Sequence, residues 1–156
     1  MKPKLSLAVT IIALSLCSFV TLKAIAKEQS AVFAGGCFWC TESDFEKLDG
    51  VISAASGYIG GRVKNPSYKQ VSAGGTGHAE AVEVIFDDQT VSYSDLVEYF
   101  WKTIDPTDGG GQFCDRGQQY RSEIFYQTEE QRSIAQTSKD ALAASGLLKA
   151  EIVTQL

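Results

Sequence analysis

The stretch that decides the fold is AVFAGGCFWCTE, residues 31–42. Its apolar beginning predicts a buried strand, and the two glycines that follow allow the backbone to turn sharply. Phe38, Phe45 and Leu48 share one face at a helical spacing, which predicts a helix after Cys37. Cys37 then lies at or beside a helix N-terminus, where unpaired amides and the helix dipole favour the thiolate. We therefore expect the rest of the chain to position something against Cys37.

Beyond this stretch, predicted strands and helices alternate. Apolar clusters or period-two alternation predict strands over residues 51–59, 78–86, 120–126 and 151–156. Three residues are expected to cap helices: Asn65, Ser92 and Thr128. Residues 105–117, which contain three consecutive glycines, are expected to form a long loop. The alternation predicts a mixed α/β or α+β sandwich with helices packed on a sheet, and it leaves the topology open.

Residues 1–26 have the three-part layout of a secretory signal peptide. Lys2 and Lys4 form a basic start, residues 5–20 are largely apolar, and Ala24-Ile25-Ala26 fits a cleavage site. We expect an exported protein, periplasmic or extracellular, with an uncleaved membrane anchor as the alternative. A lipoprotein is disfavoured because the residue before Cys17 is bulky.

The charge and cysteine counts narrow the function of residues 27–156. The whole chain has a net charge of −5, and removal of three lysines with the signal peptide makes it −8. An acidic domain without a basic stripe argues against binding to nucleic acid or to an anionic membrane surface. Three cysteines remain, Cys37, Cys40 and Cys114, so at least one thiol lies outside any intramolecular bridge.

Cys37 and Cys40 form a Cys-x-x-Cys motif, which is typical of redox chemistry. A structural bridge or half of a metal site are the alternatives. If the strand phase holds, Glu80 shares a face with Val82 and Val84. A core-facing carboxyl is costly to ionise, so its pKa should rise and it could donate a proton. The alternative is that Glu80 is solvated at a loop margin.

Aromatic side chains and one histidine complete the set of candidates. Tyr68 and Tyr120 are polar-tipped aromatics beside loops. Phe38 and Trp39 cannot both face inward from adjacent helical positions, so one of them should line the cavity around the nucleophile. His78 could serve as the base of a cysteine hydrolase, or complete a zinc site with the three cysteines, although a lone histidine is usually structural.

Five motifs give the chain a family resemblance. They are GCFW at 36–39, GYIGG at 57–61, NPSY at 65–68, GHAE at 77–80 and DRGQQYRS at 115–122. In this order they resemble peptide methionine sulfoxide reductase A over nearly all of residues 31–156. The resemblance implies an α+β, ferredoxin-like two-layer sandwich with helices packed on a mixed sheet. It also implies a peptide-methionine (S)-S-oxide reductase, an oxidoreductase that repairs oxidised proteins.

The same resemblance assigns roles to individual residues. Cys37 attacks the sulfoxide sulfur of peptide-bound or free methionine sulfoxide and becomes a sulfenic acid. Glu80 protonates or hydrogen-bonds the sulfoxide oxygen. A disulfide then forms and is reduced by a thioredoxin-type donor, with no metal or organic cofactor and a monomeric enzyme expected. The substrate-binding residues implied are Phe38, Trp39, Tyr68, Asp115 and Tyr120.

Two departures from the family pattern matter. Cys40 stands where many members have a small residue, so we expect it to be the resolving thiol. The acidic, tyrosine- and histidine-containing segment typical of the family's C-terminus does not follow Leu156, so a C-terminal part of the family domain is expected to be missing. Two other functions stay open: a thiol–disulfide oxidoreductase that uses Cys37 and Cys40 as a pair, and a zinc-binding module.

Overall fold

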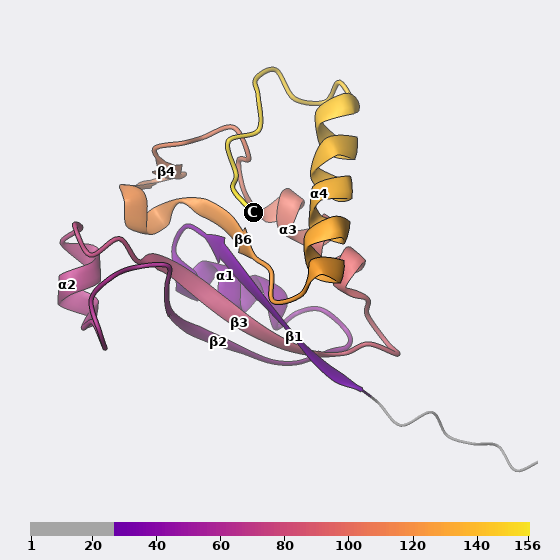
Figure 1. The fold of residues 1–156 in the computed structure, drawn as a ribbon, viewed down its shortest axis with the longest axis horizontal. Coiled ribbons are helices and arrows are strands. Elements are labelled where there is room, and N and C mark those ends of the chain that lie inside the picture. The colour runs from indigo at the N-terminus through magenta and orange to yellow at the C-terminus, as the bar shows by residue number, and fades with distance from the viewer. Residues whose placement is uncertain (1–26) are drawn as a thin grey trace, which may run out of the picture.

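The computed structural model describes residues 27–156, and the predicted signal peptide lies outside the described residues. A four-stranded sheet forms the centre of the molecule (Figure 1). Its strands stand in the order β2 (Val51–Ile59), β3 (Ala79–Asp87), β1 (Glu28–Gly35) and β6 (Ser122–Phe125). Each strand is antiparallel to its neighbour. The sheet is therefore antiparallel across its named strands, rather than mixed as predicted.

Helices cover one face of this sheet: α1 (Phe38–Phe45), α3 (Tyr93–Thr103) and α4 (Glu129–Ala144). Alternate residues of the strands point toward them, as a period of two requires. Val82, Val84 and Phe86 of β3 are buried there as predicted, whereas Glu83 is exposed on the other face. The core between the layers also holds Ala31, Phe33, Phe45, Leu96, Phe100, Ile124 and Ala135.

Two of the three predicted helix N-caps are confirmed. Ser92 caps α3, with Asp95 bonding back to it, and Thr128 accepts a hydrogen bond from the Gln131 amide at the start of α4. The third prediction, Asn65, is wrong. The helix α2 (Tyr68–Ser72) begins two residues later than expected because Ser67 forms a reciprocal capping box with Gln70. Asn65 instead takes a left-handed conformation, with φ of 48°.

The predicted loop over residues 105–117 contains a small hairpin. Its strands are β4 (Gly111–Gln112) and β5 (Asp115–Arg116), and a 3₁₀ turn, η1 (Gln118–Tyr120), follows. The strand expected from residue 120 therefore starts at Ser122. At the chain end, the predicted strand is reduced to one parallel bridge between Gln155 and Glu123 of β6.

Segments from across the chain gather at one end of the sheet. The carboxyl end of β1, the start of α1, α2 and β4 lie at this end in Figure 1. Within residues 27–156 no helix combines the length and the apolar character needed to cross a membrane.

Candidate active site

Cys37 lies at the turn between β1 and α1, as predicted. It is the N-cap residue of α1, half-buried, and its carbonyl oxygen accepts the amides of Cys40 and Thr41, each at 3.1 Å. The turn depends on Gly36, whose φ of +94° suits glycine alone among ordinary residues. Cys37 is thus placed at a helix start, where the first amides have no partner within the helix.

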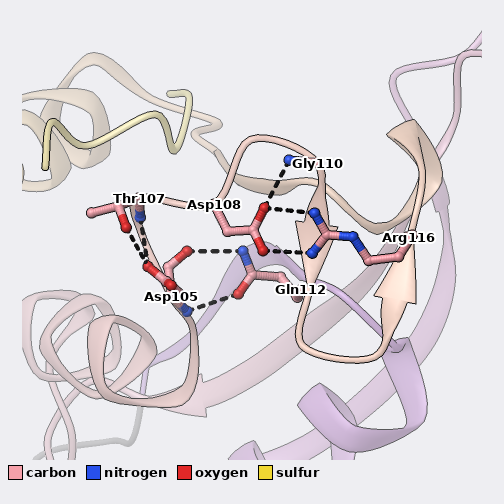
Figure 2. Close-up of polar contacts among 6 residues, drawn as sticks. All are labelled: Asp105, Thr107, Asp108, Gly110, Gln112 and Arg116. Atoms are coloured by element: carbon pink, nitrogen blue, oxygen red, sulfur yellow. Dashed lines mark hydrogen bonds and ion pairs between the residues drawn. The ribbon is translucent and has the colours of Figure 1, made fainter.

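The β4–β5 hairpin is packed directly against this turn. A Cβ atom on Gly36 would lie 2.6 Å from the Cβ of Gln112, so a side chain cannot be accommodated there. Gln112 is 1% exposed. Its amide nitrogen donates to the carbonyl oxygen of Asp105 at 2.9 Å, and its oxygen accepts the Asp105 amide at 2.7 Å (Figure 2). The hairpin is therefore packed on the turn that carries Cys37, while its bonds to Asp105 hold Gln112 in place within the loop.

A second clamp holds the base of the hairpin. Both oxygens of Asp108 accept from the guanidinium of Arg116, and one of them also accepts the Gly110 amide at 2.9 Å (Figure 2). Two parallel N–H···O bonds fix the orientation of both groups. The hairpin is thus held at its base from two sides.

Glu80 is the buried carboxyl of the site. It lies on the core-facing side of β3 and is 2% exposed, which confirms the predicted strand phase. One oxygen accepts the backbone amide of Phe38 at 3.1 Å. Among the residues that the structure describes, the other oxygen has no hydrogen-bond partner. Burial raises the pKa of Glu80, the Phe38 amide partly opposes this rise, and the charge of Asp115 adds to it.

Four aromatic rings form a cluster next to Cys37 and Glu80: those of Phe38, Trp39, Tyr58 and Tyr68. Phe38 is buried, whereas Trp39 is 60% exposed, so the two neighbours do face different ways. Trp39 stacks on Tyr68 with ring centroids 5.7 Å apart. Phe38 lies 5.6 Å from the ring of Tyr58, which is paired with Glu80 across β2 and β3. The rings are therefore in mutual contact and form one continuous aromatic cluster.

Cys40 lies one helical turn from Cys37 and is exposed. A hydrogen bond to Cys37 raises the pKa of Cys40, and burial and the charges of Cys37, Asp115 and Asp44 add to the effect. The Cys40 amide donates to the Cys37 carbonyl oxygen at 3.1 Å, so the two cysteines are neighbours on the first turn of α1. Within residues 27–156, Cys37, Cys40 and Cys114 are all free thiols.

Asp115 and Tyr120 come from the hairpin and the turn after it. Burial raises the pKa of Tyr120, and the charges of Glu80, Tyr68, Asp115 and Cys37 raise it further. The same charge of Asp115 acts on Glu80 and Cys40. The charge of Asp115 thus influences the pKa of Glu80, of Cys40 and of Tyr120.

The sequence of residues 29–156 is similar to that of one known protein family. The family model described as peptide methionine sulfoxide reductase matches residues 29–156. Peptide methionine sulfoxide reductase MsrA of Streptococcus agalactiae is 58% identical over 128 residues, which cover 82% of this chain and 76% of that protein. The chain belongs to the peptide methionine sulfoxide reductase family.

Solved structures of sulfoxide reductases have a similar fold. The methionine sulfoxide reductase A of Corynebacterium diphtheriae matches with a TM-score of 0.70 and 34% identity, over 81% of this chain and 62% of that one. Reduced Mxr1 of Saccharomyces cerevisiae matches with a TM-score of 0.74 and 29% identity, over 83% and 75%. Mxr1 in complex with Trx2 matches at 20% identity, with a TM-score of 0.56, and bears on the fold alone.

In this sulfoxide reductase, His78 has a structural role. Its Nδ1 accepts the Gly61 amide at 3.3 Å, and its Nε2 lies 2.9 Å from the carbonyl oxygen of Val63. The neutral tautomer with a hydrogen on Nε2 satisfies both bonds, so neither nitrogen is available as a catalytic base. Nor do three or more His, Cys, Asp or Glu side chains in residues 27–156 form a group that could hold a metal ion. The hydrolase and zinc alternatives therefore lack their sites.

Two residues of this neighbourhood were not predicted from the sequence. Tyr58 lies opposite Glu80, and burial raises the pKa of its hydroxyl, with the charges of Glu80 and Tyr68 adding to the rise. The sequence could have placed Tyr58 opposite Glu80 only if the pairing of β2 with β3, and its register, had been known. Gln112 was hidden because it lies in a glycine-rich loop, where a buried side chain is unexpected.

Proposed function

We propose that this chain reduces methionine S-sulfoxide to methionine, both within peptides and as the free amino acid. The observation that carries the proposal is the buried Glu80 carboxyl beside the Cys37 turn. One of its oxygens is held by the Phe38 amide, while the other is buried without a partner among the described residues. A buried polar atom of this kind is satisfied when a ligand supplies the missing hydrogen bond. The oxygen of a bound sulfoxide is such a ligand.

In the proposed reaction the Cys37 thiolate attacks the sulfoxide sulfur. Protonated Glu80 donates its proton to the sulfoxide oxygen, which is a poor leaving group until it is protonated. The oxygen is transferred to Cys37, which is oxidised to a sulfenic acid, while the sulfoxide is reduced to the thioether of methionine. Tyr68 and Tyr120 hydrogen-bond the oxygen, Asp115 hydrogen-bonds in the site, and Phe38 and Trp39 hold the methyl group.

We propose that Cys40 resolves the sulfenic acid. Its thiol attacks the sulfur of Cys37, which forms a disulfide and releases water. The position of Cys40 on the first turn of α1, where its amide donates to the Cys37 carbonyl oxygen at 3.1 Å, supports this step because it keeps the two residues close. A thioredoxin-type dithiol then reduces the disulfide and is itself oxidised.

Three further proposals concern the setting of this chemistry. The four sheet strands and the helices α1 and α3 follow one another as βαββαβ, with α2, the β4–β5 hairpin and η1 inserted between them, and α4 follows β6. This succession and the sheet order β2-β3-β1-β6 support the term ferredoxin-like. We propose that the enzyme is a monomer that needs no metal or organic cofactor, because thiols supply its electrons. We also propose that residues 1–26 direct export, which N-terminal sequencing of protein from the periplasm or medium would test.

The decisive experiment is turnover of the separated S and R epimers of methionine sulfoxide with dithiothreitol as reductant. We expect turnover of the S epimer alone, and turnover of neither epimer would overturn the proposal. Peptide mapping after one equivalent of sulfoxide should find Cys37 joined to Cys40. A link between Cys37 and Cys114, or a persistent sulfenic acid, would show that the resolving thiol is assigned wrongly.

A further inference from the structure

The tip of the β4–β5 hairpin consists of Phe113 and Cys114. Phe113 adopts a backbone conformation that is unfavourable for its residue type, and little packing within the protein compensates for it. Phe113 has a φ of +52°, a left-handed conformation that is unfavourable for a bulky residue and that glycine or asparagine adopts readily. Its side chain is 68% exposed, so it obtains little packing in return. Residues that break a local rule in this way are expected at functional sites.

The hairpin tip lies close to the nucleophile. The Cα of Gln112 would be 3.9 Å from a Cβ on Gly36, and Phe113 and Cys37 are the next residues along each segment. Because consecutive Cα atoms are 3.8 Å apart, the Cα atoms of Phe113 and Cys37 are at most about 13 Å apart. The clamps at Gln112 and Arg116 fix the base of the hairpin, so the position of the tip is set before a substrate arrives (Figure 2).

We propose that Phe113 contacts the polypeptide on either side of the oxidised methionine, and that it favours apolar residues there. An extended peptide advances about 3.3–3.6 Å per residue, so residues two or three positions from the sulfoxide reach the tip. Free methionine sulfoxide has no atoms at that distance. The proposal deepens the proposed function, on which it rests, by naming a determinant of peptide over amino-acid substrates.

The place at which the hairpin is attached indicates that Phe113 contacts the substrate rather than the reducing partner. It packs on Gly36, the residue before the nucleophile, and it carries Asp115, whose charge acts on Glu80 and Tyr120. These are the groups that meet the sulfoxide in the proposed reaction. A peptide that places its sulfoxide between Cys37 and Glu80 therefore has to pass the side of the site that the hairpin borders.

The test uses Phe113→Gly and Phe113→Asn, both of which suit the left-handed backbone. We expect a melting temperature equal to or above that of the natural protein, because strain is removed and little packing is lost. The substrates are free S-sulfoxide and two peptides of equal length, with leucine or glycine at the two positions on each side. We expect both variants to lose about tenfold in kcat/KM on the leucine peptide, chiefly through KM. Turnover of the glycine peptide and of the free amino acid should be unchanged.

Leu147 provides a matched control. It is 79% exposed and follows α4, which Figure 1 places on the other side of the molecule from β4. Leu147→Asn should leave all three substrates unaffected.

Three results would overturn the proposal. An equal loss on all three substrates would mean that the hairpin supports the site only structurally. A change confined to the KM for thioredoxin would make the tip a donor contact, and no change at all would leave Phe113 without a role. If the natural protein fails to reduce free S-sulfoxide, it is the proposed function that falls, so the two failures are distinguishable.

Discussion

Replacing Glu80 with glutamine separates proton donation from the shape of the site. The glutamine amide oxygen can still accept the Phe38 amide, as Glu80 does at 3.1 Å, and its NH₂ group then takes the place of the unpartnered carboxyl oxygen. The variant can therefore hydrogen-bond a sulfoxide oxygen but cannot protonate it. General acids contribute 10²- to 10⁴-fold, and the retained hydrogen bond places the expected loss near the lower limit, at about 100-fold. This corresponds to about 2.7 kcal/mol of transition-state stabilisation.

The assay compares two reactions of the same cysteine. Glu80→Gln should lower kcat/KM for free S-sulfoxide with dithiothreitol, while the rate at which Cys37 reacts with a small disulfide probe changes less than about threefold, because disulfide exchange needs no protonated carboxyl. Glu83→Gln is the matched control, since Glu83 lies on the same strand but is exposed on the opposite face. Equal loss in both reactions would refute the acid role, because it would mean that Glu80 affects the general reactivity of Cys37.

The pH dependence of stability and of activity provides a second test of the acid role of Glu80. Because burial raises the pKa of Glu80 above its ordinary value of 4.5, the folded protein retains a proton that the unfolded chain releases. The stability that this proton contributes is complete below pH 4.5 and is lost as the pH rises through the raised pKa. Urea titrations over this window should show a decline for the natural protein that Glu80→Gln lacks. The sulfoxide reductase activity that depends on the acid should fall over the same range.

Four other substitutions test the site and the residues that support it. Tyr93→Phe should raise the free energy of unfolding by about 1 kcal/mol, because the Tyr93 hydroxyl is buried without a partner in the described part of the chain and burial raises its pKa to about 12. Tyr99→Phe should lower it by about 1 kcal/mol, since that hydroxyl donates to the Asp44 carbonyl at 3.2 Å; a urea titration that reverses these signs would contradict the reasoning. Gly36→Ala should destabilise the fold by about 1–2 kcal/mol more than Gly75→Ala, because both have a positive φ but only Gly36 meets Gln112; equal melting temperatures would show that the contact relaxes freely. Cys40→Ser should reduce one equivalent of sulfoxide and then stall with a thioredoxin donor in a stopped-flow assay, and sustained turnover would assign resolution to another thiol.

Much of the site could be predicted because its residues lie in regular elements. Cys37 follows an apolar run and two glycines, and Glu80 lies in a strand whose alternation is clear, so periodicity placed both. The caps at Ser92 and Thr128 were equally local features. Val51–Ile59 was predicted with its full bounds because it is bounded by glycines on both sides.

The remaining features depend on contacts between distant segments. Gln112 is buried only because Asp105 offers both a donor and an acceptor to its amide, and no local pattern indicates that pairing. Phe113 takes a conformation that its own preferences oppose. The helix after Asn65 began late because two capping residues competed and the reciprocal bonds of Ser67 prevailed.

The pairing of β1 has a consequence for how the protein folds. β1 bonds to β3 and β6 but not to β2, so its partners lie about 50 and 90 residues along the chain. Such non-local pairing requires large loops to close, and it places folding in the slower part of the range for domains of this size. Joining β1 to β3 brings Cys37 near Glu80, whereas Asp115 and Tyr120 arrive with the segment that ends in β6. Cys37 and Glu80 can therefore meet in a partly folded chain, before Asp115 and Tyr120 join them.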